Sequence, residues 1–253
     1  MKSDLLRDNL RSKLLKNRQG FLIIKKVSDD PNKIKNLTFK ISDSLGKRVE
    51  QSDKKNLYLK ITPKTSKIKN KKNLKSSNLR YHETNFGGSI HTDGPQLKVP
   101  PKILVMSCVR NAKSGGFSII TNAKKIYNYI KQNSPRTLKI LKKNFYFERR
   151  GFKKRGPRYF SSPIFFKKGA SIIFRYLREY IESGHQLAKK KLNTNQIDAM
   201  NYLDKLLINK KFIKKYKLLS GDIIMLNNHI MAHGRSSFKL EKAKRLFIRT
   251  WIN

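Results

Sequence analysis

A histidine and an aspartate two residues apart, His91 and Asp93, stand shortly before a largely apolar segment at 103–109. On a strand, residues i and i+2 point to the same face, so the two side chains can reach one point in space. One imidazole and one carboxylate are two of the three ligands in the facial triad that holds non-haem Fe(II). The pattern also fits a locally hydrogen-bonded pair in a glycine-rich turn, so it indicates a metal centre only if a distant third ligand converges on it.

Apolar periodicity and turn residues predict a β-rich chain. We expect strands at 21–25, 57–61, 103–109, 145–147, 171–176, 223–226, around His233 and at 246–252. We expect helices at 5–15, at 34–45, after Thr121 and at 197–207, the last with Thr194 as its N-cap. Helices come first and strands later, without a repeat or a linker. This order indicates a mainly β protein with flanking helices, a double-stranded β-helix (jelly roll, cupin-like), formed as one domain by residues 1–253. The Lys-, Ser- and Asn-rich stretch at 63–80 is expected to be a mobile lid.

The charge balance is strongly basic, with 59 Lys and Arg against 16 Asp and Glu and a net charge of +43. One interpretation is codon usage in an AT-rich genome, although Glu should then be common as well. The other is a polyanionic partner such as a nucleic acid. Basic residues without any acid crowd 54–80 and 149–178 but are also spread elsewhere. This spread favours an ordinary solvated surface over a dedicated nucleic-acid module.

Cys108 is the only cysteine, so the chain cannot form an internal disulfide and a reducing compartment is expected. The chain has no run of 18 apolar residues and no signal-peptide core. We therefore expect a cytoplasmic protein without a membrane partner. The sequence does not indicate an oligomeric state.

The third ligand has few candidates, because the chain contains only five histidines. His82 and His185 are expected to be surface or locally bonded histidines. His229 and His233 are four residues apart, a spacing that puts them on one face of a helix, as in a zinc site. Their place after a Gly-Asp turn and a strand indicates β structure instead, and the spacing alone does not choose between them.

Arg245, directly before the last predicted strand, and Arg249 on that strand follow His233. If the strand extends to Arg245, both point to one face, opposite Leu246 and Ile248. Two guanidinium groups directed into an apolar barrel need an anion. A dicarboxylic acid such as 2-oxoglutarate fits one of them through a bidentate salt link. The alternative is that both pair with acids of the protein, of which this chain has few.

Three segments together resemble the taurine dioxygenase family of Fe(II)/2-oxoglutarate-dependent oxygenases: NFGGSIHTDG at 85–94, GGFS at 115–118, and HGR at 233–235 followed by Arg245 and Arg249. Their order and spacing match over nearly the whole chain. The resemblance implies that His91, Asp93 and His233 bind iron.

The resemblance also implies roles for other residues. Arg245 would pair with the far carboxylate of 2-oxoglutarate, and Ser118, where the family often has threonine, would bind the same group. Arg249 would contact the co-substrate or an anionic substrate, and Asn85 the substrate. His229 matches no ligand of the family. The presence of Asp93 argues against halogenation, because related halogenases lack that carboxylate.

The expected activity is hydroxylation of a C–H bond in a small anionic molecule, with Fe(II) as cofactor and 2-oxoglutarate as co-substrate. Two alternatives are the same chemistry on a nucleic acid or carrier-bound substrate, and a non-catalytic basic jelly-roll binding module. A zinc hydrolase that uses His229 and His233 lacks a general base beside them.

Overall fold

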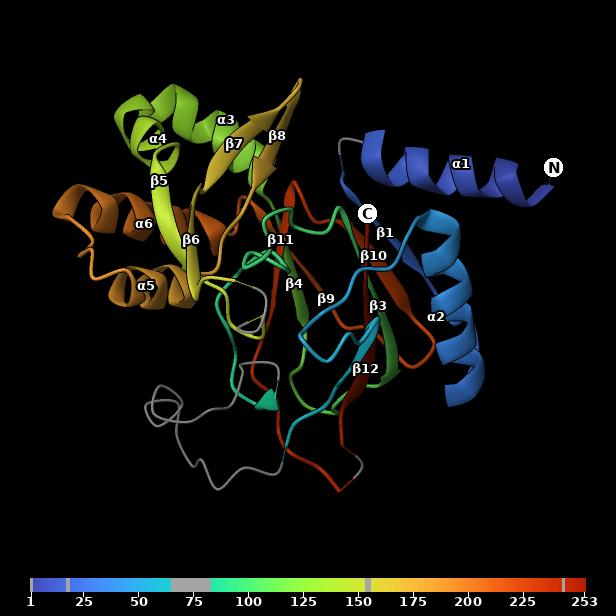
Figure 1. Cartoon of the computed structure of the whole chain (residues 1–253). Coiled ribbons are helices and arrows are strands. Elements are labelled where there is room, and N and C mark those ends of the chain that lie inside the picture. Colours follow the sequence, from blue (N-terminus) through green and yellow to red (C-terminus); the bar gives the residue numbers. More distant parts are fainter. Residues whose placement is uncertain (1, 17–18, 65–82, 153–155, 243) are drawn as a thin grey trace.

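The computed structural model describes residues 2–16, 19–64, 83–152, 156–242 and 244–253 (Figure 1). Within these residues the helices are α1 (Lys2–Lys16), α2 (Pro31–Leu45), α3 (Ala123–Asn133), α4 (Pro135–Leu141), α5 (Arg178–Leu187) and α6 (Thr194–Leu207). The strands are β1 (Phe21–Ile24), β2 (Tyr58–Ile61), β3 (Ile103–Arg110), β4 (Ser118–Asn122), β5 (Asn144–Glu148), β6 (Tyr159–Pro163), β7 (Phe165–Lys168), β8 (Ser171–Phe174), β9 (Ile213–Tyr216), β10 (Ile223–Asn227), β11 (Met231–Arg235) and β12 (Leu246–Ile252). None of the described helices is long and apolar enough to cross a membrane.

Five antiparallel strands form the larger sheet, in the order β1-β10-β3-β12-β2. Helices α1 and α2 cover one face of this sheet (Figure 1). Helix α2 begins where Asp30 accepts a hydrogen bond from the backbone N–H of Lys33 and Pro31 occupies the first turn, and it ends at Gly46. Its apolar stripe packs on alternate residues of the sheet, so Ile34 lies in one cluster with Val109 and Ile248.

Three antiparallel strands, β11-β4-β9, form the smaller sheet. Strand residues alternate between two faces, so the inner face of each sheet is apolar and points to the other. One buried cluster holds Ile120 and Met231 of the smaller sheet together with Leu104, Leu226 and Phe247 of the larger. The core therefore lies between the two sheets.

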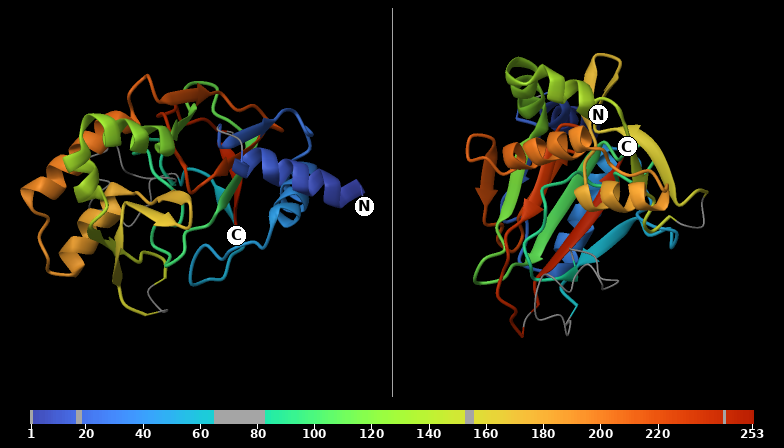
Figure 2. Two further views of the ribbon diagram at one scale, coloured as in Figure 1. Left: turned by 90° about the horizontal axis from the view of Figure 1, so that it is seen from above. Right: turned by 90° about the vertical axis from the view of Figure 1, so that its left-hand side faces the viewer.

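Helices α3 to α6 and the hairpins β5-β6 and β7-β8 gather on the side of the sheets opposite α1 and α2 (Figures 1 and 2). They enclose a second apolar cluster of aliphatic and aromatic side chains that includes Phe145, Phe165 and Phe174. Helix α5 lies directly on β5, because Gly184 brings its backbone against Tyr146 at a place where a Cβ atom would be 2.3 Å from the Tyr146 carbonyl oxygen. This layer closes the molecule next to the segment that carries His91.

The structure confirms a β-rich chain with flanking helices and corrects two predictions. Helices do not all come first, since α3 to α6 stand between β4 and β9. The N-cap of α6 is Asn193, one residue before Thr194: its side chain accepts a hydrogen bond from the N–H of Gln196, whose side chain accepts one in return. The segment predicted as a lid, 63–80, lies outside the described residues except for positions 63 and 64.

Candidate metal centre

A pair of backbone hydrogen bonds brings the first and third predicted ligands together. The N–H of His91 donates to the carbonyl oxygen of His233 (2.9 Å), and the N–H of His233 donates to that of His91 (2.7 Å). Thr92, between His91 and Asp93, donates its N–H to the Tyr176 carbonyl oxygen (2.9 Å). The hydroxyl oxygen of Thr92 accepts the N–H of Tyr176 (3.0 Å). Main-chain contacts to two distant segments thus fix the His-x-Asp segment.

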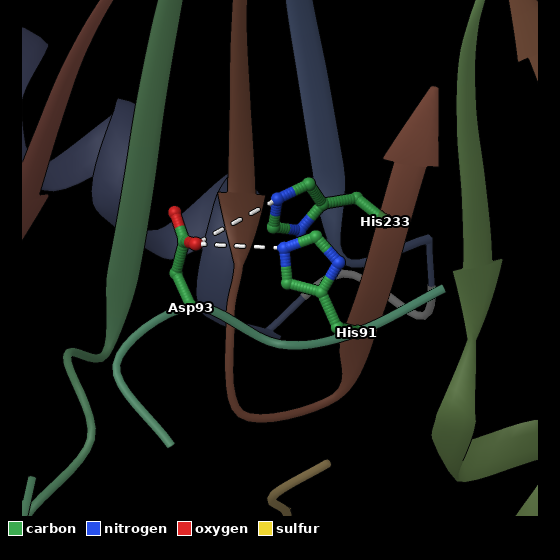
Figure 3. Close-up of side chains that lie close together, drawn as sticks. All are labelled: His91, Asp93 and His233. Atoms are coloured by element: carbon green, nitrogen blue, oxygen red, sulfur yellow. Dashed lines mark ion pairs between the residues drawn. The ribbon is translucent and has the colours of Figure 1, made fainter. Parts of the chain in front are cut away.

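The side chains of His91, Asp93 and His233 converge on one point (Figure 3). Each offers one ligand atom, and these atoms lie within 4.8 Å of one another. The Oδ1 atom of Asp93 is 3.8 Å from Nε2 of His91 and 4.0 Å from Nε2 of His233. All three side chains are buried, with residue exposures of 6%, 4% and 7%. Among the described residues this is the group of His, Cys, Asp and Glu side chains that could hold a metal ion.

Burial and neighbouring charge place these groups in the forms that bind metal. Burial alone would raise the pKa of Asp93, but Arg249, the two histidines and a hydrogen bond from Trp251 together lower it to about 2. Burial, together with the charges of His91 and Arg249, lowers the pKa of His233 to about 3. At neutral pH the site therefore presents an ionised carboxylate and a neutral His233 imidazole, as metal binding requires.

The donor set fits a ferrous ion. Two imidazole nitrogens and one carboxylate oxygen, all on one side of the metal position, are the arrangement that leaves positions open in non-haem Fe(II) oxygenases. Nδ1 of His91 lies 2.9 Å from the carbonyl oxygen of Ser89. That contact orients the ring so that Nε2 faces the cluster, the usual support for a metal-binding histidine.

The carboxylate of Asp93 accepts a side-chain hydrogen bond at each of its two oxygens. Arg249 donates from Nη1 to Oδ1 (3.1 Å), and Trp251 donates from Nε1 to Oδ2 (2.8 Å). Gln51, fully buried, accepts from Nε of Arg249 (3.0 Å) and donates to the Arg249 carbonyl oxygen (3.0 Å). Arg249 therefore forms an ion pair with Asp93, an acid of the protein itself, and lies beside the metal position.

Asn228, in the turn between β10 and β11, clamps the backbone of Asp93. Its Oδ1 accepts the N–H of Asp93 (2.8 Å), while its Nδ2 donates to the carbonyl oxygens of Asp93 (2.9 Å) and Pro101 (2.8 Å). The side-chain amide of Asn228 therefore pairs with both the N–H and the carbonyl oxygen of Asp93, as a backbone partner on a neighbouring strand would. It links the segment of the first two ligands to the strand of the third.

Arg245 lies in a separate buried position beside the Gly-Gly segment. Its Nε donates to Oδ1 of Asn111 (3.2 Å), and its guanidinium lies 3.9 Å from the ring centroid of Phe247. A Cβ atom on Gly116 would be 3.6 Å from Nε of Arg245. Ser118, two residues on, begins β4 and is buried at 4% exposure. The structure therefore places Gly116, two residues before Ser118, beside Arg245.

The remaining predicted residues lie outside the cluster. Asn85 donates from its side chain to the carbonyl oxygen of Phe238 (3.3 Å). His229 is in the turn before β11, where its Nε2 lies 3.2 Å from the Pro100 carbonyl oxygen, so it does not share a strand face with His233. His185 is buried on α5 and bonded locally to the Lys190 carbonyl oxygen. His82 lies outside the described residues.

Sequence reasoning missed Gln51, Asn111, Trp251 and Asn228 as parts of the site. The period of two along β12 could have found Trp251, since it shares the face of Arg249. The other three carry no signal in the sequence, because their roles depend on which loops meet in space.

Comparison with known proteins agrees with this arrangement. The family model "Taurine catabolism dioxygenase TauD, TfdA family" matches residues 3–251. FR-33289 synthase of Streptomyces rubellomurinus is 26% identical over 189 residues, which are 71% of this chain and 53% of that protein. Human gamma-butyrobetaine dioxygenase is 24% identical over 229 residues, 87% of this chain and 53% of that protein. The chain thus spans about half the length of these two relatives.

Solved structures share the fold over nearly the whole chain. An asparagine oxygenase in complex with Fe(II), 3-hydroxyasparagine and succinate has a TM-score of 0.75 at 13% identity, covering 98% of this chain and 79% of its own. The non-heme iron oxygenase OrfP with Fe and alpha-ketoglutaric acid has a TM-score of 0.69 at 15% identity, with coverage of 98% and 79%. With a family model that matches all but a few residues and a His-Asp-His cluster at its expected position, the chain belongs to the TauD/TfdA dioxygenase family.

Proposed function

We propose that the chain is an Fe(II)- and 2-oxoglutarate-dependent oxygenase that hydroxylates a C–H bond of a small, carboxylate-bearing molecule. The observation that carries this proposal is the buried convergence of His91, Asp93 and His233, with one donor atom each within 4.8 Å. Membership of the TauD/TfdA family supports it. The two packed sheets are proposed to be the halves of a double-stranded β-helix, within one oxygenase domain over 1–253.

His91, Asp93 and His233 hold the iron in this proposal, and the protein fixes them through their backbones before any ion binds. Bound iron together with 2-oxoglutarate supplies the oxidising chemistry, which uses oxygen to functionalise a C–H bond. The residues themselves contribute a dry, preformed site. Their exposures of 4–7% keep bulk water from the reacting centre.

Arg245 and Ser118 bind the far carboxylate of 2-oxoglutarate in this proposal. Three observations support the placement: Arg245 is 6% exposed, its guanidinium lies on the ring face of Phe247, and its Nε is fixed by the neutral amide of Asn111. A planar guanidinium held in this way is prepared for a bidentate carboxylate. The absence of a side chain at Gly116 lets its backbone lie against Asn111 and Arg245, since a Cβ atom there would be 2.7 Å from Oδ1 of Asn111.

The substrate is proposed to carry a carboxylate that Arg249 helps to bind. Arg249 touches Asp93 and therefore stands next to the metal position. The asparagine oxygenase structure holds 3-hydroxyasparagine, and OrfP structures hold hydroxylated arginines, both of which carry such a group. Asn85 is proposed as a further substrate contact, because its segment leads into the His-x-Asp turn. The cationic chain, at +43, attracts anions in general.

Succinate release measures this activity directly. Purified protein with Fe(II), 2-oxoglutarate and a panel of amino acids, N-methylated amino acids and dicarboxylates should form succinate above the substrate-free rate with at least one compound. The His233→Ala variant is the control and should not respond. A panel without any response would contradict the small-molecule proposal.

The same chemistry on a nucleic acid is the second candidate, and the net charge of +43 is the observation that favours it. It predicts binding to single-stranded or duplex DNA that weakens steeply with salt. If no binding is measured at low salt, this candidate is removed.

A further inference from the structure

The two oxygens of Asp93 face different surroundings. Oδ1 is the atom turned toward both imidazoles, whereas Oδ2 points away from them (Figure 3). Oδ2 accepts the indole N–H of Trp251 at 2.8 Å. An ionised carboxylate strengthens such a bond, and burial of both groups keeps water from competing for it. Together with Arg249, which donates to Oδ1 (3.1 Å), the indole therefore sets the rotation of the carboxylate about its Cβ–Cγ bond.

Trp251 is itself rigidly held. It is 2% exposed and lies opposite Leu104 in the register of β12 and β3. Its carbonyl oxygen accepts the N–H of Val49 (2.7 Å). The alternation of β12 puts Trp251, Arg249 and Phe247 on the inner face, while Ile248 packs outward in the cluster with Ile34. The position of the indole N–H is thus determined by the larger sheet and not by the metal segment.

The number of carboxylate oxygens on the metal decides how many positions stay open. Three single-atom protein ligands leave three of six octahedral positions, which is what a chelating co-substrate and oxygen together require. A carboxylate that chelated through both oxygens would take one of these three. We propose that the indole N–H of Trp251 is a positioning group that restrains Asp93 to a single metal-binding oxygen. This inference rests on the metal centre of the proposed function and adds a specific role to a residue outside the triad.

Trp251 is also the only tryptophan of the chain. Its indole is separated from the metal position only by one carboxylate, so the intrinsic fluorescence of the native protein should report metal binding. Mn(II) is a suitable probe, because it is paramagnetic and binds the same oxygen and nitrogen ligands. We expect saturable quenching of the emission that is complete at one equivalent of Mn(II).

The test replaces one chemical group. In a tryptophan-auxotrophic host, β-(3-benzothienyl)alanine replaces tryptophan with sulfur in place of the N–H, and in this chain it enters at position 251 alone. The analogue keeps the ring shape and so the packing against the sheet. Trp251→Phe, which also lacks the donor, is the second variant, and circular dichroism checks that each protein is folded.

The readout is the water-proton relaxivity of bound Mn(II), which counts the waters on the metal. If the analogue protein lets Asp93 bind through both oxygens, the open positions fall from three to two and relaxivity per bound Mn(II) falls by about one third. Mn(II) binding weakened tenfold or more in a folded analogue protein would also support a positioning role.

Unchanged relaxivity at full occupancy with unchanged affinity would overturn the inference, as would native fluorescence that does not respond to bound Mn(II). If the native chain binds no Mn(II) or Fe(II) at all, the metal centre itself fails and the inference fails with it.

Discussion

His91 and His233 are joined by reciprocal backbone hydrogen bonds, at 2.9 and 2.7 Å, although 141 residues of sequence separate them. Ligand convergence therefore depends on main-chain pairing. Ordinary sheet-like bonds position two of the three ligands, and Asn228 fixes the backbone of the third. A site built in this way does not need the metal to assemble it.

We expect the metal-free chain to stay folded. Treatment with EDTA should leave its circular dichroism spectrum unchanged, whereas Mn(II) at a hundredfold excess over its Kd should add about 2.7 kcal/mol to the free energy of unfolding. The His233→Ala variant should lose this gain, because it removes one of three ligands. Loss of secondary structure on chelation would contradict a preassembled site.

Gly116→Ala should weaken 2-oxoglutarate binding. A Cβ atom there would lie 2.7 Å from Oδ1 of Asn111, the atom that holds Arg245. We expect the KM for 2-oxoglutarate to rise about tenfold, equivalent to 1.4 kcal/mol, with a smaller change in kcat. Gly169→Ala is the matched control: Gly169 also has positive φ (+58° against +71°), but nothing lies within 4 Å of its Cβ position. Equal effects of both variants on KM would show that backbone strain, and not Arg245, is responsible.

Arg175→Met should stabilise the fold. Arg175 is 2% exposed, and its Nε and Nη1 atoms have no hydrogen-bond partner within the described chain. Burial lowers its pKa to about 10, which shows that the charged form is disfavoured there. Contacts with aromatic rings such as Phe160, 5.0 Å away, recover only part of this cost. Since an apolar side chain of similar length avoids desolvation of the charge, we expect a gain of about 1–3 kcal/mol in urea unfolding.

The control for that substitution is Arg178→Met. Arg178 donates to Glu182 (2.9 Å) and Asp204 (2.7 Å), so its charge is compensated and its removal should not stabilise the protein. A loss of stability in Arg175→Met would show that the aromatic contacts and the bond from Nη2 to the Lys98 carbonyl oxygen (2.9 Å) outweigh the desolvation of the guanidinium.

Asp222→Asn should lower stability in a pH-dependent way. Burial raises the pKa of Asp222, but hydrogen bonds from Lys25 and from the N–H groups of Leu219 and Lys26 outweigh it and the net shift is downward. A depressed pKa in the folded state contributes stability above the unfolded pKa, and that stability is lost as pH falls through the folded pKa. Urea unfolding should therefore show a deficit of about 1–3 kcal/mol at pH 7 that narrows toward acid. A deficit independent of pH would contradict the ionic account.

Sequence patterns predicted all five strands of the larger sheet but missed β4, β6, β7 and β9. In β12, alternation correctly put Arg249 opposite Ile248, because a strand between an inner core and an outer helix layer must alternate. Helix α5 was not predicted, because Gly184 lowers the local helix propensity. The structure explains this glycine by the close contact of its backbone with Tyr146.

Spacing predicted that His91 and Asp93 point together, the family resemblance singled out His233 over His229, and the supporting residues were not predicted. His91 and Asp93 are close in sequence, and few other histidines compete with His233. The bond from Arg249 of β12 to Asp93, and the clamp that Asn228 forms on the Asp93 backbone, depend on contacts between segments that are distant in the sequence, which no local pattern encodes. The arginine pair was accordingly expected to bind ligand alone, whereas one of its members also holds a metal ligand.

The most direct test of a ferrous site that binds 2-oxoglutarate is absorption spectroscopy without oxygen. Stoichiometric Fe(II) and then 2-oxoglutarate are added to the purified protein and to the variants His233→Ala and Arg245→Met. We predict a visible metal-to-ligand charge-transfer band in the native protein, no band in His233→Ala, and a band in Arg245→Met that requires a higher concentration of 2-oxoglutarate. A native protein that binds Fe(II) yet shows no band at saturating 2-oxoglutarate would contradict the account.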